Sequence, residues 1–566
     1  MEVKDRLKIF SDLKSERTDY DDDWQIVADY VYTVKADFTK HDEDTSFTNQ
    51  QLYDKTATMS LNVRAATLLS LLWDSGKFVY KPNQKYFKDK SDLNDWFQYC
   101  TDVAKKEFYK AEADRIFDES ELDEGAFGMS YPFLDGSNDG LNLKLFQVKE
   151  CYINETKGDK IDTLYRNYCI TVKQCVDTFG YDNISDSVKS AYDSNRYNEK
   201  VEMLHIIQPR MMRNVTKKGV EDMPYESIYI DIKANKEIKK QGVQKGFEYF
   251  PVFISREGKR NGEKYAYSPT MMAIEEVSQI NKVREDQILI INRYADPAIG
   301  YDSTALESNI LNTSPGSSTG FRMSGRAGIP IFDMVQTKGD PSAVENLIVR
   351  LQETINKYYG IDVLLDFNTQ NQMTLGEAQI RANIRQQTLG ATLMKKRAEK
   401  YRPIVERAFD ILFKQGKFGY MPNDEKIAVE EELGLKPMII PEDIVNLINA
   451  GLEPMELIEV QFYTQFEYEK ELLKNNSIIQ TWNNAGLIAQ LTQRPEVFDN
   501  LDEDKTIKEL GTSSFNIDIF RDQKEIKAIR GARADNAAQQ QQLSTMQQGA
   551  TIAKDLGVNV SNNKKQ

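Results

Sequence analysis

Two long helices that begin in the same way bracket an irregular stretch of this chain. Ser268-Pro269 and Asp340-Pro341 each place a helix-capping residue directly before a proline, which is favoured at the first position of a helix. These starts predict helices over 268–294 and 341–360. The segment between them, 295–339, is rich in Gly, Ser, Pro and Asn. The pattern indicates an antiparallel helix pair with a small irregular unit at its end.

The second of these helices has one apolar seam. Val344, Ile348, Leu351, Ile355 and Tyr358 follow one another at steps of three and four residues, which places them on one face of a helix. A helix with a single apolar face needs a neighbour that buries this face. The seam therefore predicts a packing partner.

A third long helix is marked by its start. Thr374 and Glu377 form a T-x-x-E capping box, and helical spacing continues to Gly416, with a kink expected at Pro403. A helix of this length spans about 60 Å, which is too long for the middle of one compact domain. We expect this helix to tie separate domains together.

The rest of the chain divides into helical and β-rich parts. Apolar residues at helical spacing predict helices near 20–31, over 53–73 and from Ser91 onward. Alternating or β-branched runs between about 125 and 256 predict strands, at 141–145, 201–207, 227–232 and 252–255. From Pro441 to about Ala534 the pattern is helical again. The predicted fold class is α+β and mostly helical.

Composition excludes several classes of protein. The 566 residues include 73 Lys and Arg against 88 Asp and Glu, a formal net charge of −15. An acidic chain is unsuited to gripping nucleic acid over a large surface, although nucleic acid can slide past it. No apolar run approaches the roughly 18–20 residues of a membrane-spanning helix. Four cysteines without a CxxC pair indicate a reducing compartment, and the first residues lack the apolar region of a signal peptide.

The search for catalytic motifs yields no site. The chain has two histidines, His41 and His205, which excludes HExxH and most histidine-based metal sites. No Gly-Lys pair is followed by Ser or Thr, so a P-loop is excluded. Gly316–Gly320 matches G-x-S-x-G, but no apolar strand precedes it and both histidines lie upstream. We expect a flexible loop there and no catalytic, cofactor or metal residues in the chain.

Five motifs, taken in order, resemble the head-to-tail connector (portal) proteins of short-tailed double-stranded DNA phages. The likeness covers roughly 5–535. The matching residues are Leu52-Tyr53-Asp54-Lys55-Thr56-Ala57-Thr58 with Arg64-Ala65-Ala66; Gly262-Glu263-Lys264-Tyr265 before Ser268-Pro269; Met373-Thr374 with Glu377; Gly390 with Arg397, Glu399, Pro403 and Phe409; and Pro495 to Asn500 with Asp502. Ala266-Tyr267 and Val460-Gln461-Phe462-Tyr463 depart from the family pattern.

The resemblance implies a ring of twelve copies at one capsid vertex, through which DNA is packaged and later leaves. The implied partners are further copies of the chain, the major capsid protein and scaffold, the terminase large subunit as a transient motor, a tail adaptor or head completion protein, and double-stranded DNA without sequence specificity. No membrane partner and no cofactor are implied. The protein would be made in the host cytoplasm and would end at the portal vertex of the virion.

The family's named parts divide this chain in order. The resemblance implies a wing at 1–267, a first stem helix at 268–294, a clip at 295–340 and a second stem helix at 341–360. A tunnel loop near 366–373 and a long wing helix would fill 361–435, and a helical crown would fill 436–535. The polar tail 536–566 is expected to be disordered.

Two sets of residues are candidates for contact with DNA or with partner proteins. Basic residues on the stem helices and polar residues of the tunnel loop are expected to face the DNA channel: Lys282, Arg284, Arg350, Lys357, Asn368, Gln370, Asn371 and Gln372. Residues in the clip are expected to dock the motor and then the adaptor: Tyr301, Ser318, Phe321, Arg322 and Arg326. For each stem residue a salt bridge between subunits is the alternative role.

Two other classes of function stay open at this point. The first is a different structural component of the virion, either a tail adaptor or an internal protein, although the insert between two helices speaks against this. The other class is a soluble hydrolase that uses Ser318 as its nucleophile. An assay of the Ser318→Ala variant would discriminate the hydrolase from the two structural proteins.

Overall fold

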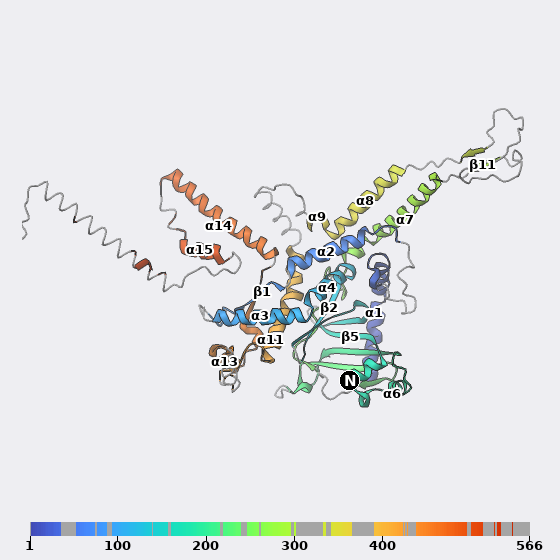
Figure 1. The fold of residues 1–566 in the computed structure, drawn as a ribbon, viewed down its shortest axis with the longest axis horizontal. Helices are drawn as coiled ribbons and strands as arrows, with labels where there is room; N and C mark the ends of the chain where they lie inside the picture. The colour runs from blue at the N-terminus through green and yellow to red at the C-terminus, as the bar shows by residue number, and fades with distance from the viewer. Residues whose placement is uncertain are drawn as a thin grey trace, which may run out of the picture. The chain divides into compact units, whose positions relative to one another are not determined.

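The structure is a computed structural model of the chain, which divides into two compact units, Met1–Glu467 and Tyr468–Gln566 (Figure 1). The residues that it describes are 2–35, 52–73, 76–87, 93–137, 140–156, 160–214, 219–238, 246–259, 262–295, 299–301, 332–334, 341–364, 390–422, 424, 427, 437–463, 465–494, 498, 500–512, 526, 529–531, 533 and 546.

Helices dominate the first unit, and short antiparallel sheets join them. Its helices are α1 (Val3–Tyr30), α2 (Thr56–Leu72), α3 (Asn94–Lys110), α4 (Ala113–Phe127), α5 (Val172–Phe179), α6 (Asp186–Asp193), α7 (Pro269–Ala295), α8 (Pro341–Tyr359), α9 (Ile361–Leu364), α11 (Arg402–Lys414) and α13 (Glu442–Asn449). Its strands are β1 (Phe78–Pro82), β2 (Met129–Ser137), β3 (Gly140–Phe146), β4 (Cys151–Thr156), β5 (Lys160–Thr171), β6 (Lys200–Pro209), β7 (Tyr225–Asp231), β8 (Lys236–Ile238), β9 (Gly246–Phe247), β10 (Ser255–Arg256), β11 (Ile299–Tyr301), β12 (Phe332–Met334) and β13 (Ile458–Phe462). The predicted mostly helical α+β class is confirmed.

A six-stranded antiparallel sheet forms most of the β-rich part. Its order is β4-β5-β6-β7-β8, and β9 also pairs with β7. Helix α1 lies along one face (Figure 1), where Phe10 and Leu13 pack against Leu204 and Ile206. Met203 points to the other face, as alternation along β6 requires, and packs with residues of α5 and α6.

The β-rich part differs from the sequence prediction in two ways. Helices α5 and α6 interrupt the region from 125 to 256, where only strands were expected. At 252–255 the predicted strand is reduced to one bridge between Val252 and Phe133 and to the two-residue strand β10. Helices α5 and α6 are both short. The Thr171 hydroxyl caps α5 by accepting from the Gln174 backbone N–H, and the Ser185 hydroxyl caps α6 by accepting from the Val188 backbone N–H.

The prediction of a continuous helical region from Pro441 onward is wrong at β13. Ile458, Val460 and Phe462 are buried and alternate with exposed residues, so this segment has the period of a strand. It pairs antiparallel with β1, with Phe78 opposite Phe462. Strand β13 thus belongs to the large core that β1, α3 and α11 share.

The predicted long helix is only partly within the described residues. Helical structure runs from 390 to 414, whereas its predicted start at Thr374 lies outside the described part. Directly before α11 the helix widens into a π-helical turn, Arg397–Tyr401, and Pro403 follows in the first turn of α11. A proline interrupts the hydrogen bonds of a helix, and a π-helical turn is one way in which a helix accommodates such an interruption. The irregularity expected at Pro403 is therefore found as this turn, directly before the proline.

Six buried charged side chains tie several elements of the first unit together. This charge cluster consists of Arg64, Glu121, Glu124, Glu257, Lys396 and Lys400. Lys396 Nζ lies 2.9 Å from Glu121 Oε2 and 2.7 Å from Glu257 Oε2, and it also contacts Glu124. Lys400 Nζ lies 2.6 Å from one carboxylate oxygen of Glu121 and 2.6 Å from one of Glu124. The cluster holds three positive and three negative groups, so no net charge is buried.

Arg64 extends the charge cluster to the end of α8. Its Nη2 lies 2.5 Å from Glu257 Oε1, and its Nη1 donates to the carbonyl oxygen of Tyr359 at 2.8 Å. Hydroxyl groups complete the network, because Tyr401 donates to Glu121 at 2.8 Å and Ser130 donates to Glu124 at 2.6 Å. Charges that share this many partners avoid the cost of an unpaired buried ion.

The pKa values agree with charges that stay paired. Burial alone would raise the pKa of Glu124, but the ammonium groups of Lys396 and Lys400 outweigh burial and hold it well below its usual value. The pKa of Glu257 is lowered in the same way by Lys396 and Arg64. Burial alone would lower the pKa of Lys396, yet the surrounding carboxylates raise it. All these groups remain ionised at neutral pH.

The second unit is described through two helices. Helix α14 (Gln465–Thr492) begins at the boundary of the units, and α15 (Glu503–Thr512) follows it. Trp482 stacks on Phe498 with ring centroids 6.0 Å apart, and its Nε1 donates to Thr506 Oγ1 at 3.2 Å. The predicted disordered tail 536–566 lies outside the described residues apart from Met546.

Gly128, which ends α4, tests how closely the loop before α7 must approach this helix. Its φ is +84°, and a Cβ placed there would lie 2.5 Å from the carbonyl oxygen of Ala266. We expect Gly128→Ala to destabilise the protein by about 3 kcal/mol, from backbone strain plus this clash. The midpoint of thermal unfolding measures the effect. Gly416→Ala is the matched control, because φ is +72° there and no atom lies within 4 Å; equal losses for both variants would contradict the clash.

Replacement of Glu124 by glutamine tests the charge cluster. Glu124→Gln leaves Lys396 and Lys400 with one carboxylate fewer in a buried site, and we expect a loss of about 3–5 kcal/mol at pH 7. The wild-type advantage is fully present above the pKa of an unfolded glutamate, about 4.3. Since the folded state holds the pKa of Glu124 lower, this advantage shrinks as the pH falls below that value. Thermal unfolding from pH 7 to pH 3 measures the difference.

An exposed ion pair supplies the control for this experiment. Glu199 lies 3.0 Å from Arg196, and both side chains are about half exposed. Glu199→Gln should change stability by less than about 1 kcal/mol at every pH. A loss at Glu124 no larger than at Glu199 would show that the cluster contributes little.

Candidate functional site

Helices α7 and α8 form an antiparallel pair, which Figure 1 shows rising from the rest of the first unit. Ala273, Val277 and Ile280 of α7 are buried against the seam of α8. Both helices begin at the prolines named by the sequence, Pro269 and Pro341. Whether the pair is the family's stem stays a prediction.

The buried seam of α8 differs from the predicted one at its end. Ile348, Leu351 and Ile355 are buried as expected, and Val344 is partly buried. Tyr359 is fully buried, whereas Tyr358 is 40% exposed and its hydroxyl donates to Glu276 at 3.3 Å. The prediction of Tyr358 in the seam is therefore wrong. A step of three from Ile355 fits a helix as well as a step of four, so sequence spacing could not decide between them.

Hydrogen bonds fix the base of the pair onto α4. The Ser268 hydroxyl accepts from Met271 N–H at 2.9 Å and donates to the Ala126 carbonyl oxygen at 2.6 Å. Thr270 Oγ1 donates to the Gly125 carbonyl oxygen at 2.8 Å and lies 2.8 Å from the Tyr359 hydroxyl. Ser268 thus caps α7 and anchors it in the same contact.

The start of α2 crosses the middle of the pair. The backbone N–H groups of Tyr53 and Asp54 donate to Asn281 Oδ1 of α7, at 2.9 and 3.1 Å. Gln352 Nε2 of α8 donates to the Asp54 carboxylate at 3.1 Å. The segment before α2 therefore binds both helices and holds their relative position.

The two basic residues predicted on α7 are both paired. Lys282 is exposed, and its Nζ lies 2.7 Å from Glu285 on the same helix, which raises the pKa of Lys282 through that hydrogen bond. Arg284 lies 3.6 Å from Asp54 and 3.4 Å from Glu345 of α8. Arg284 therefore holds α7, α8 and the start of α2 together in one copy.

The two basic residues predicted on α8 are exposed and lie outside such pairs. Arg350 and Lys357 form no side-chain ion pair within the described part of the chain. They are seven residues apart, so they lie on one face of α8, roughly opposite its buried seam. Of the four basic residues predicted on the two helices, Arg350 and Lys357 are the two whose charge is available to DNA or to another copy of the chain.

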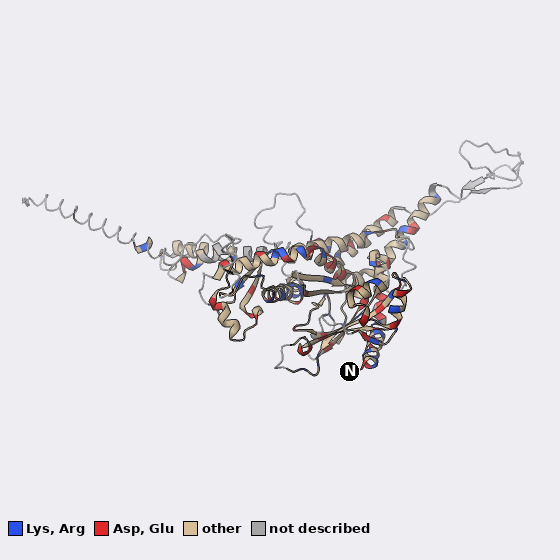
Figure 2. Cartoon of the chain, turned by 60° about the horizontal axis from the view of Figure 1, so that its bottom comes forward, with Lys and Arg blue, Asp and Glu red and all other residues tan. Residues whose placement is uncertain are grey.

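Charges on the pair nearly balance. Figure 2 shows acidic and basic positions interspersed along both helices. The acidic residues are Glu275, Glu276, Glu285, Asp286, Glu345 and Glu353, and the basic residues are Lys282, Arg284, Arg293, Arg350 and Lys357. The excess of carboxylates in this chain is therefore not concentrated on the pair.

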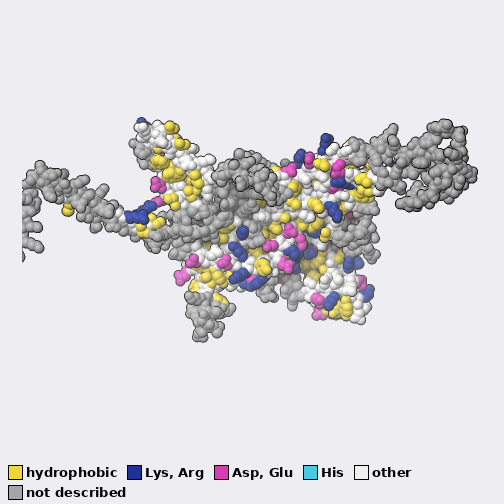
Figure 3. Space-filling model, turned by 45° about the horizontal axis from the view of Figure 1, so that its top comes forward, with side chains coloured by type: hydrophobic (Ala, Val, Ile, Leu, Met, Phe, Trp, Pro, Cys, Tyr) yellow, Lys and Arg dark blue, Asp and Glu magenta, His cyan; other side chains and the backbone are white. Residues whose placement is uncertain are grey.

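Apolar side chains are also exposed on the pair. Figure 3 shows such side chains among charged ones near the end of the pair. They are Met272, Ile288, Leu289, Ile291, Leu347, Val349 and Tyr358. Exposed apolar groups gathered on one element are typical of a surface that binds another chain.

Beyond the pair the chain continues through β11 and β12. These strands pair antiparallel, with Ile299 opposite Met334 and Tyr301 opposite Phe332. The structure places the Tyr301 backbone in β11. The other predicted docking residues, Ser318, Phe321, Arg322 and Arg326, lie outside the described residues, as do the predicted channel residues Asn368, Gln370, Asn371 and Gln372.

Three residues that organise the pair were not among the predicted sites. Asp54 and Glu345 pair with Arg284, and Asn281 of α7 accepts hydrogen bonds from the backbone before α2. Asp54 lies within the Leu52-Tyr53-Asp54 motif, so a signal existed for it. Asn281 and Glu345 are polar residues on helices with many others, and their spacing carries no signal.

Two kinds of feature are not found among the described residues. Among them, no group of three or more His, Cys, Asp or Glu side chains is arranged to hold a metal ion. In the same part of the chain no helix is long and apolar enough to cross a membrane. The arrangement presents free cations, apolar side chains and a paired strand unit to other molecules.

Solved structures offer limited similarity. A chain from the virion of a native gene transfer agent particle is 11% identical and covers 68% of this chain and 91% of its own length, with a TM-score of 0.32. This similarity adds nothing to the assignment.

Sequence comparison is more specific. The chain is 24% identical over 570 residues to the portal protein of Salmonella phage epsilon15, and 22% identical over 556 residues to the probable portal protein of Bordetella phage BPP-1. Each alignment covers 97% of this chain and 94% of the relative. The model of the bacteriophage head to tail connecting protein family matches residues 4–514. The resemblance predicted from the five motifs is confirmed, and the chain belongs to the bacteriophage head to tail connecting protein family.

Proposed function

We propose that this chain is a phage portal protein whose copies form a closed ring of twelve at one vertex of the capsid. Membership of the head to tail connecting family and similarity to two phage portal proteins over 97% of the chain support the portal function. DNA enters the capsid through the centre of the ring during packaging and leaves by the same route.

The carrying observation is the surface of the helix pair. Its apolar side chains, such as Leu289 and Val349, are exposed in one copy although the seam between α7 and α8 is already filled. A closed ring gives every copy a neighbour on both sides, so such groups are buried without an open-ended filament. One copy alone leaves them in water.

The charges of the pair suit a conduit. Carboxylates and basic groups nearly balance along α7 and α8, so phosphates are neither strongly held nor strongly expelled there. In a ring of twelve, Arg350 and Lys357 repeat at two levels of the channel wall. Rings of single cations give DNA many weak contacts instead of a tight grip.

The strand pair β11–β12 belongs to the segment that we propose as the docking site for partner proteins. We place the clip at 295–340, which binds the terminase large subunit during packaging and the tail adaptor afterwards. The capsid protein and scaffold would surround the rest of the ring, and the assembled protein resides at the portal vertex of the virion. The only described parts of the clip are its strands, which emerge between α7 and α8.

Ring formation is the first test. Twelve copies of 65.1 kDa give a particle of about 0.78 MDa, and mass photometry of the purified full chain should show this species. Negative-stain images should show a central hole. Single copies at every salt concentration, or filled particles, would contradict the proposal.

Removal of the two free cations on α8 tests contact with DNA. If both side chains face the DNA channel, the Arg350→Gln/Lys357→Gln variant still forms rings of the same mass. For a short duplex bound by the ring, the plot of log affinity against log salt has a negative slope. The magnitude of this slope should decrease by about 1 or more in the variant. Fluorescence anisotropy of a labelled duplex over a salt series measures this slope.

Lys264→Gln is the matched control. Lys264 precedes α7, and its Nζ lies 2.7 Å from Glu16 of α1. Its loss should leave the slope unchanged. If the double variant forms no rings, Arg350 and Lys357 instead join subunits; if rings form with an unchanged slope, neither residue contacts DNA.

A further inference from the structure

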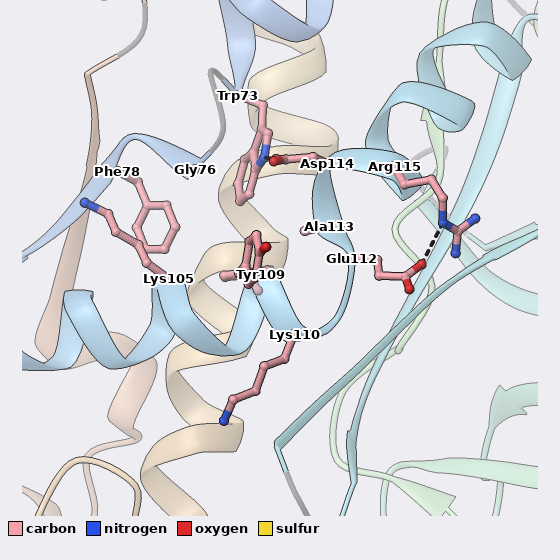
Figure 4. Close-up of a pocket in the computed structure, with 11 residues that line it drawn as sticks. Trp73, Gly76, Phe78, Lys105, Tyr109, Lys110, Glu112, Ala113, Asp114 and Arg115 are labelled. Atoms are coloured by element: carbon pink, nitrogen blue, oxygen red, sulfur yellow. Dashed lines mark hydrogen bonds and ion pairs between the residues drawn. The ribbon is translucent and has the colours of Figure 1, made fainter.

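A pocket of about 520 Å³ opens where α3 turns into α4. The end of α2, the start of β1, the last turns of α3 and the first turn of α4 line this α3–α4 pocket (Figure 4). Of its aromatic residues, Trp73, Phe78 and Phe108 are buried, whereas Tyr109 is exposed. The pocket lies apart from the helix pair, and the proposed function does not use it.

Most charged groups around the pocket already have partners. Lys110 Nζ lies 2.7 Å from Glu107. Arg115 contacts Glu112 at 2.7 Å and Glu119 at 2.8 Å, the first of which Figure 4 marks. The Trp73 indole N–H donates to Asp114 at 2.6 Å. None of these groups needs a ligand.

Lys105 is the exception. Its ammonium lies 5.9 Å from the centroid of the Phe78 ring, and the side chain is half-buried. Within the described part of the chain it forms no hydrogen bond and no ion pair. The carboxylate that acts on it is Asp102, one turn earlier on α3, which is exposed and accepts from Gln98 Nε2 at 3.2 Å. Burial lowers the pKa of Lys105, and Asp102 opposes that effect.

The unpartnered ammonium of Lys105 and the aromatic ring beside it indicate which kind of ligand the pocket would bind. A carboxylate would restore a partner to Lys105, and an apolar group next to that carboxylate would bury aromatic surface. Tyr109 lines the pocket and is 84% exposed, which leaves its ring free to cover such a group. Glu112 adopts the left-handed conformation with φ of 53°, an unusual backbone for a residue with a side chain, and shapes the turn at the pocket.

We propose that the α3–α4 pocket receives an acidic segment of a second copy of this chain, with a carboxylate at Lys105 and an apolar neighbour against the exposed ring of Tyr109. This rests on the proposed ring. Each copy has 88 acidic against 73 basic residues, so a neighbouring copy offers carboxylates in excess. In a ring, a surface of one copy meets a different surface of the next, so a pocket and an inserting segment need not lie close together on the same chain.

Photo-crosslinking in assembled rings tests this inference. Benzoylphenylalanine replaces Tyr109 in the full chain, and rings are collected by mass before irradiation. We expect covalent dimers, with the crosslink mapped by mass spectrometry to a segment of the second copy that contains Asp or Glu. Adding Lys105→Met should lower the yield of dimers about tenfold, the contribution of a hydrogen bond to a charged group.

Lys106→Met is the matched control, because Lys106 is the next residue on α3, is exposed and does not line the pocket. The yield of covalent dimers from the Lys106→Met variant should equal that from rings in which both lysines are present. Rings that give no dimers, a crosslink to a segment without acidic residues, capture of a different virion protein, or equal yields for the two lysine variants would each overturn the inference while the ring stands. If no rings form, the proposed function fails together with it.

Discussion

The buried charge cluster is the constraint on which the first unit depends. Three cations and three carboxylates from α2, α4, the loop after β10 and the helix before α11 meet in a buried site. Each element is positioned by charge as well as by shape, because a shift of any one leaves a buried ion unpaired. The hydrogen bond from Arg64 to the end of α8 carries this constraint to the helix pair.

The helix pair is accordingly secured at its base. Ser268 and Thr270 anchor α7 to α4, and Asp54 with Asn281 links the start of α2 to the pair farther along. The apolar seam closes α7 against α8. Loose packing within one copy therefore does not explain the apolar side chains that stay exposed on the pair. In the proposed ring, a neighbouring copy would cover them.

Local signals in the sequence predicted the pair well and the cluster not at all. A capping residue before proline marks α7 and α8 within one residue, because both effects act on adjacent positions. Lys396 with Lys400, and Glu121 with Glu124, have the spacing of any solvated helix face, and only the tertiary fold brings these faces together. Strand β13 carries a local strand signal in the alternation of Ile458, Val460 and Phe462, and the helical prediction overlooked it. Its partner β1 could not be inferred, because Phe78 lies about 380 residues before Phe462.

Among the described residues of the first unit, the buried charges have partners within one copy, whereas several groups at the surface do not. Inside the first unit the charges of the cluster have partners within one copy, and their pKa shifts show ions that gain from being paired. On the described surface, Arg350 and Lys357 of α8, the apolar residues of the pair and Lys105 of the pocket are left incomplete. In the proposed ring, DNA would contact Arg350 and Lys357. A neighbouring copy would cover the apolar residues of the pair and bind Lys105. A single chain thus pairs the charges of its own core, and the groups left on its surface are those that DNA and the proposed ring would contact.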